Sequence, residues 1–170
     1  MTAIITRTTI ESAAYDNIFE IMDTRSNIAD PRGSSAGGRT FIYDSDPLMK
    51  ALDFSGMPYI VLELPELEYD KESTDGKHKF ITWKHTITVR TVKDGSSGSR
   101  VNTGRSDMQA ICDDLNETFN SRTIKDELRL LEIEGIKLTK LSTDTLTLDQ
   151  QLSYEARYEL EYRVRLQTSV

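Results

Sequence analysis

The sequence predicts an α+β fold, in which a mainly antiparallel β-sheet built from two hairpins is packed by two α-helices on one face, with long flexible loops. Three stretches support this prediction. Residues 154–166 alternate between apolar and charged side chains, which is the pattern of a strand with one buried and one polar face. Residues 58–92 contain two further strand-like runs around an Asp-Gly turn. Residues 106–122 show the apolar spacing of an amphipathic helix.

The length and composition are those of one ordinary globular domain. Residues 1–170 are enough to bury a hydrophobic core without disulfides or structural metals. The single cysteine, Cys112, excludes an intrachain disulfide and a cysteine-based metal cluster, and it fits a reducing compartment. A formal net charge of −7 argues against a basic nucleic-acid-binding surface or attraction to an anionic membrane. No apolar run reaches the roughly 18 residues of a membrane-spanning helix, so we expect a soluble protein.

The first third of the chain is expected to contain one long helix and several short elements. Residues 8–25 have the apolar spacing of a helix with a broad buried stripe. Residues 27–39 are rich in glycine and serine and predict a flexible loop. Residues 41–43 predict a short strand, and residues 46–53 begin with Asp-Pro, which favours the start of a short helix.

The first hairpin is predicted over residues 58–92. Its first strand, residues 58–69, is expected to be interrupted at Pro65, because proline has no N–H group to donate to a neighbouring strand. The return strand, residues 78–92, places apolar side chains and one histidine on a single face. These residues are Ile81, Trp83, His85, Ile87 and Val89.

The second half of the chain predicts a loop, a helix and a second hairpin. Residues 94–105 predict a flexible loop, and the following helix is expected to begin with a capping box made by Ser106 and Gln109. The buried stripe of this helix is predicted to be Met108, Ile111, Cys112, Leu115 and Phe119.

The second hairpin is predicted over residues 127–141 and 154–166. In its first strand, Leu128 and Leu130 are expected to face inward, with a bulge or bend at Gly135.

The polar residues form no recognisable enzyme motif, so we expect a protein without catalytic residues, cofactor or metal. His78 and His85 are seven residues apart on one predicted strand, so they point to opposite faces and cannot share a site. His85 lies on the apolar face and is expected to be a core residue. Cys112 lies on the apolar face of a helix and is expected to be a buried, inert thiol. The glycine-rich loops lack the lysine of a phosphate-binding P-loop.

Two groups of acidic residues leave chemical alternatives open. One group could hold a hard cation, although helix capping and turn formation also explain its members. It consists of Asp44, Asp46 and Asp53. The other could provide paired carboxylates for glycoside chemistry, although such residues are common on solvated strands. It consists of Glu63, Glu66, Glu68 and Asp70.

The order of the predicted elements resembles the tail terminator proteins of long-tailed bacteriophages and related viruses, also called tail completion or minor tail proteins. The resemblance covers residues 8–166 and rests on an N-terminal helix, a long hairpin entered through the segment PYIVLELPELEYD (residues 58–70), a capped helix and a terminal strand pair. The segment at residues 27–54 and the wide second loop depart from shorter family members.

This resemblance implies a non-enzymatic structural protein of the virion tail or neck, assembled in the host cytoplasm. The family forms a ring, expected to be hexameric, that caps the tail tube and joins the tail to the head-completion or connector complex. The implied partners are further copies of the chain, the major tail tube protein and the connector protein. DNA would pass through the lumen without specific binding. The alternatives are another head–tail joining or baseplate protein, or a non-viral protein-binding module.

The residues predicted to contact neighbouring subunits or partner proteins are all charged. They lie in the two predicted loops and on the polar face of the last strand. The alternative interpretations of these positions are loops that contact no partner and a sheet face that is exposed to solvent. The residues are Arg32, Arg39, Arg100, Arg105, Glu155, Arg157, Glu159, Glu161, Arg163 and Arg165.

Overall fold

The structure is a computed structural model of the chain. It describes residues 7–25, 28, 30–31, 40–45, 58–69, 78–92, 103–148 and 151–167. The predicted short helix at residues 46–53 lies outside these ranges, as do most of the loop predicted at residues 27–39 and residues 94–102 of the second loop.

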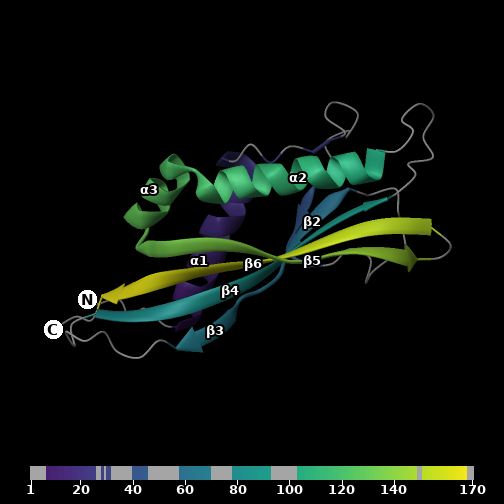
Figure 1. Ribbon diagram of the computed structural model, residues 1–170. Helices are drawn as coiled ribbons and strands as arrows, with labels where there is room; N and C mark the ends of the chain where they lie inside the picture. The colour runs from purple at the N-terminus through teal and green to yellow at the C-terminus, as the bar shows by residue number, and fades with distance from the viewer. Residues whose placement is uncertain are drawn as a thin grey trace.

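Six strands of the described residues form one sheet (Figure 1). They are β1 (Ile42–Tyr43), β2 (Tyr59–Leu62), β3 (Glu66–Tyr69), β4 (His78–Val92), β5 (Ile133–Leu148) and β6 (Gln151–Gln167). Their order across the sheet is β1-β2-β4-β6-β5, and β3 pairs with the half of β4 that β2 leaves free. Only the pairing of β1 with β2 is parallel among these strands, so the predicted α+β class with a mainly antiparallel sheet is confirmed.

Three helices of the described residues pack on one face of this sheet, one more than predicted. They are α1 (Arg7–Glu20), which continues into the π-helical turn η1 (Ile21–Arg25), α2 (Thr103–Asn120) and α3 (Arg122–Leu130). In Figure 1, α2 lies along the strands and α3 follows it at one end of the sheet. Buried side chains of all three helices join the inward side chains of β4 and β6 in one hydrophobic core.

The prediction of a strand at residues 127–141 was wrong in its first part. Residues 127–130 form the end of α3, and β5 begins only at Ile133. Leu128 is buried as expected, but it packs from a helix together with Ile124, one turn earlier. Leu130 is 85% exposed rather than inward-facing, because helical geometry turns it away from Leu128.

The predicted capping box of α2 was also wrong, because this helix begins earlier than expected. It starts at Thr103, so Ser106 lies inside the helix, and the side chain of Gln109 donates a hydrogen bond to Asp113, with Nε2 and Oδ1 2.8 Å apart. The first turn is tied to the sheet instead. The hydroxyl of Thr91, near the end of β4, donates to the carbonyl of Gly104 at 2.7 Å.

The centre of the fold is the pair β4 and β6. Their register runs without a break from His78 opposite Gln167 to Val92 opposite Ser153. The bounds predicted for β4 are confirmed. The inward residues predicted for both strands are buried where the structure describes their side chains, apart from Tyr154, which is half-buried. Those of β6 that are buried are Ala156, Tyr158, Leu160, Tyr162 and Val164.

Two predicted irregularities of the sheet are confirmed. The strand around Pro65 is interrupted, since β2 ends at Leu62 and β3 begins at Glu66. Gly135 has a φ of +66°, and the register of β5 against β6 shifts between Glu134 and Lys137. A positive φ costs glycine little, which explains why the bulge occurs at this residue.

Candidate functional site

The face of the sheet opposite the helices carries the charged residues of β6, and one of them is buried. Glu155 is only 1% exposed. Its Oε2 accepts a hydrogen bond from Nε of Arg90 at 2.7 Å, and its Oε1 accepts one from Nε of Arg157 at 2.6 Å. Arg90 also donates from Nη1 to the hydroxyl of Tyr59 at 3.2 Å. Glu155 therefore binds within its own chain and is not accessible to a partner.

The remaining charges of β6 are more open. The side chain of Arg157 is 53% exposed, and Arg163 is also exposed. Glu161 lies 3.8 Å from Nζ of Lys84 on the opposite strand, and Glu159 is half-buried. These four residues provide the accessible part of the predicted contact surface, since a partner can reach them without unfolding the sheet.

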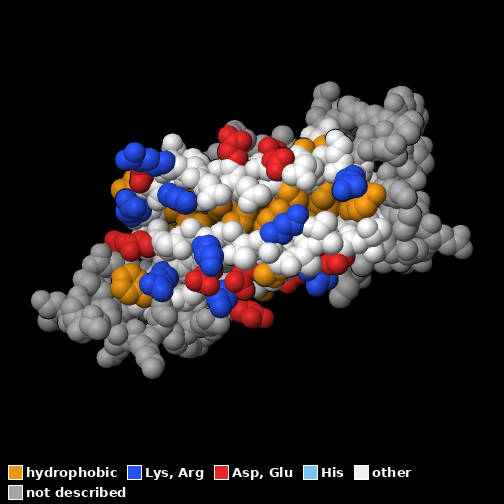
Figure 2. Space-filling model, in the orientation of Figure 1, with side chains coloured by type: hydrophobic (Ala, Val, Ile, Leu, Met, Phe, Trp, Pro, Cys, Tyr) orange, Lys and Arg blue, Asp and Glu red, His pale blue; other side chains and the backbone are white. Residues whose placement is uncertain are grey.

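Two of the exposed or half-buried charges on β6 lie opposite a charge of the other sign on β5. Lys137 of β5 lies opposite Glu161, and Glu134 lies opposite Arg163. Figure 2 shows side chains of both signs along the strands, with a strip of hydrophobic side chains between them and α2. A mixed face of this kind sets the register of strands more than it adds stability.

The other predicted contact residues do not join this surface. Arg105 is exposed in the first turn of α2, which packs on the opposite face of the sheet. It therefore belongs to a helix and not to the predicted loop. Arg165 lies on β6 opposite Phe80, but its side chain is outside the described residues. The loop arginines Arg32, Arg39 and Arg100 also lie outside the described residues.

His85 is a core residue with both ring nitrogens engaged, as predicted. Its Nδ1 lies 2.9 Å from the carbonyl oxygen of Glu63, and its Nε2 lies 2.7 Å from the hydroxyl of Tyr162. A carbonyl oxygen only accepts, so Nδ1 carries the proton and the Tyr162 hydroxyl donates to Nε2. Burial lowers the pKa of His85, which keeps the ring neutral. His85 thus links β4 to β6 and to the interruption between β2 and β3.

Cys112 is buried on the sheet-facing side of α2, as expected. Burial raises the pKa of its thiol, which disfavours the reactive thiolate form.

Two edges of the sheet are open among the described residues. One edge is β5, which is 16 residues long and pairs only with β6. The other is formed by β1, which pairs with β2, and by β3, which pairs with β4. An unpaired edge presents N–H and C=O groups that can bind another strand.

Large exposed hydrophobic side chains in the described part of the chain lie at both of these edges and at the end of α3. Leu64, 73% exposed, occupies the interruption between β2 and β3. Leu130, 85% exposed, is the last residue of α3, and Leu131, 46% exposed, follows it in the turn before β5. Leu141, 56% exposed, lies on β5 at its second register shift. The sequence alone did not place these leucines at sheet edges, because the order of the strands within the sheet decides which strands lie at its edges.

The described residues contain no helix long and apolar enough to cross a membrane. No three His, Cys, Asp or Glu side chains within the described ranges are grouped so that they could hold a metal ion, and Asp46, Asp53 and Asp70 lie outside those ranges. No protein-family model matches the chain, and no curated protein matches it either.

Proposed function

We propose that this protein is a structural, non-enzymatic subunit of a virion. In this proposal, copies of the chain assemble into a hexameric ring that caps the tail tube and joins the tail to the head-completion or connector complex. The order of elements, which resembles that of tail terminator proteins, supports this choice. The observation that carries the proposal is the exposure of leucines at both open edges of one sheet.

A closed ring requires two different surfaces on each subunit that fit each other, because a head-to-tail contact must repeat around the ring. The two sheet edges meet this requirement. The β5 edge offers a row of backbone groups together with Leu141. The opposite edge offers short strands and Leu64. Pairing one edge with the other would satisfy backbone groups and remove leucines from water.

The distribution of charge fits the same role. The net charge of −7 disfavours adhesion of DNA to a ring through which it must pass. In the proposed ring, the accessible charges Arg157, Glu159, Glu161 and Arg163 contact a neighbouring subunit or the tail tube. Exposed ion pairs contribute only about 0–1 kcal/mol each, so they would select partner and register while the edges supply most of the affinity.

Two leucine variants test the head-to-tail contact. Leu64→Asp and Leu141→Asp each place a charge on one edge, at positions already exposed to solvent. Each variant should stay folded by circular dichroism but fail to form rings in native mass spectrometry and electron microscopy. Mixing the two variants should give one-to-one pairs that do not grow, because each variant retains one intact edge. Ala110→Asp, at an exposed position of α2, is the matched control and should form rings.

Several outcomes would contradict the proposal. A wild-type chain that stays monomeric even when mixed with tail tube protein would exclude the ring. Rings formed by Leu64→Asp alone would exclude the head-to-tail use of the two edges. Binding to isolated filled heads but not to isolated tails would favour another joining protein over a tail terminator.

A further inference from the structure

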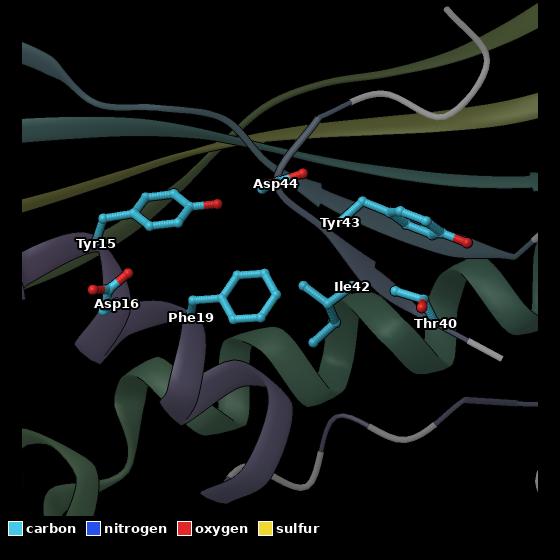
Figure 3. Close-up of a pocket in the computed structure, with 7 residues that line it drawn as sticks. All are labelled: Tyr15, Asp16, Phe19, Thr40, Ile42, Tyr43 and Asp44. Carbon is cyan, nitrogen blue, oxygen red and sulfur yellow. The ribbon is translucent and has the colours of Figure 1, made fainter. Parts of the chain in front are cut away.

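An open pocket lies between α1 and the β1 edge of the sheet, away from the charged face of β6. It has a volume of about 370 Å³. Figure 3 shows Tyr15 and Phe19 reaching from α1 toward Ile42 and Asp44. The rings of Tyr15 and Phe19 are one helical turn apart and stack, with centroids 6.1 Å apart and planes at 28°.

The position of Tyr15 is fixed by the sheet. Its hydroxyl donates a hydrogen bond to the carbonyl of Leu62 at 3.1 Å. The single phenolic proton is thereby used, and the oxygen keeps acceptor capacity toward the pocket. Tyr43 also lines the pocket, but its ring points away from Tyr15 and Phe19 and makes an edge-on contact with Tyr59, with ring centroids 5.7 Å apart. The aromatic part of the pocket is therefore formed before any ligand binds.

Two carboxylates give this pocket a negative potential. Asp16 follows Tyr15 on α1, and Asp44 follows β1; both are exposed. Within the described residues neither forms an ion pair, and Asp44 accepts a hydrogen bond from Ser45 at 3.1 Å. Burial, and then the charges of Asp44 and Asp16, raise the pKa of Tyr15 to about 12. Both carboxylates therefore act electrostatically on the point where the Tyr15 hydroxyl lies.

We propose that this pocket binds an arginine side chain presented by a partner protein. The flat guanidinium group stacks on the Tyr15 and Phe19 rings; its N–H groups donate to one of the two carboxylates, Asp16 or Asp44, and the other adds electrostatic attraction. Rings and carboxylates arranged together select an organic cation, since aromatic faces offer no ligands to a hard metal ion. Arginine fits better than lysine because its planar group can stack and bind carboxylates at the same time.

The site does not depend on the proposed ring, because a protein with any assembly role could use it to recognise a basic segment. Its position beside β1 places a bound arginine at one open edge of the sheet. A partner strand that approaches this edge could insert the side chain from its own backbone.

The test uses a minimal probe and its neutral analogue. N-acetyl-arginine methylamide is titrated into the 15N- and 13C-labelled protein and followed by NMR, with the citrulline analogue as an uncharged match. We expect saturable shifts confined to Tyr15, Phe19 and residues 42–45. Asp16→Asn combined with Asp44→Asn should weaken binding by more than tenfold, whereas Asp113→Asn, at an exposed position of α2, should leave it unchanged. The lysine analogue should bind at least threefold more weakly.

The titration is repeated on the Leu141→Asp variant, so that burial of the pocket by a neighbouring copy cannot hide binding. Equal binding of the citrulline probe, shifts spread over the acidic surface, or an unchanged affinity in the double variant would each overturn the proposal. Absence of shifts in both the wild type and Leu141→Asp would overturn it as well. None of these results bears on ring formation, which is measured separately.

Discussion

Removal of the buried charge at Glu155 should destabilise the protein strongly. Glu155→Gln keeps the size of the side chain but removes the negative charge between Arg90 and Arg157. The glutamine can accept a hydrogen bond from one guanidinium group, but its amide nitrogen must then face the other. We therefore expect the substitution to leave positive charge poorly compensated at a site that is almost closed to water.

The expected magnitude follows from burial. Glu155 is 1% exposed and the side chain of Arg90 is 14% exposed, so solvent screens this pair weakly. Removing one partner of a buried ion pair costs about 3–5 kcal/mol of unfolding free energy. For a chain of this length, that loss corresponds to a melting temperature lower by about 6–20 °C, at 2–4 °C per kcal/mol. Arg157→Ala should cost no more than about 1 kcal/mol, because that side chain is 53% exposed.

The measurement is urea unfolding at pH 7, followed by fluorescence. Trp83 is the single tryptophan and is completely buried, so its emission reports on the core next to β6. Glu159→Gln, four residues from Glu155 on the same face of β6, is the matched control and should change stability by less than about 0.5 kcal/mol. A cost below about 1 kcal/mol for Glu155→Gln, or a cost equal to that of Arg157→Ala, would refute the reasoning that burial sets the strength of this network.

Three further predictions concern the core. Leu160→Asp should prevent folding, because Leu160 is fully buried on β6 and the new charge would have no partner; a soluble variant with native circular dichroism would show that the inward face is assigned wrongly. The pKa of His85 should lie below its usual value of 6.5 in an NMR titration, with His85→Asn assigning the signal. Because the folded state disfavours the charged ring, the unfolding free energy has its full value above about pH 6.5, the pKa of histidine in the unfolded chain. It falls as the pH drops from about 6.5 toward the lower folded-state pKa, by at most about 1.4 kcal/mol per pH unit. This slope should disappear in His85→Asn, and a His85 signal titrating at or above 6.5 would contradict the assignment. Thr118→Val should raise the unfolding free energy by about 1 kcal/mol, since the buried Thr118 hydroxyl has no hydrogen-bond partner among the described residues and valine has nearly the same shape; a clear loss of stability in urea unfolding would contradict this reasoning.

The long strands were predictable because the pattern of apolar and polar residues within each strand is sufficient to identify it. Residues 78–92 and 154–166 alternate over many positions, and alternation over that length fits a strand with one buried face. The helix α3 was missed because its nine residues contain only one buried pair, Ile124 and Leu128, at helical spacing. The leucines at 128 and 130 suggested a strand instead. The choice between the helical and the strand pattern depends on how Leu128 packs into the core, and the residues that it packs against are distant in the sequence.

The candidate sites were less predictable than the fold, because they depend on contacts between residues that are distant in the sequence. Glu155 looked like its neighbours on β6, but it is buried because Arg90, 65 residues earlier, lies opposite it. The aromatic pocket joins side chains of α1 to residues of the β1 edge, and neither segment carries a motif by itself. Surface chemistry of this kind appears only when strand order brings separate segments together.

The β5 edge is protected unevenly along its length, and this asymmetry narrows where a second strand can pair. Its first half contains the two register shifts, which twist the strand, and the charged residues Lys137 and Lys140. Both features discourage uncontrolled pairing between sheet edges. Residues 142–148 pair with β6 without a further shift and contain Asp144 as their single charged residue. In the proposed ring, the neighbouring strand should therefore pair with residues 142–148, beside Leu141, while the first half of β5 keeps the contact from extending to unrelated chains.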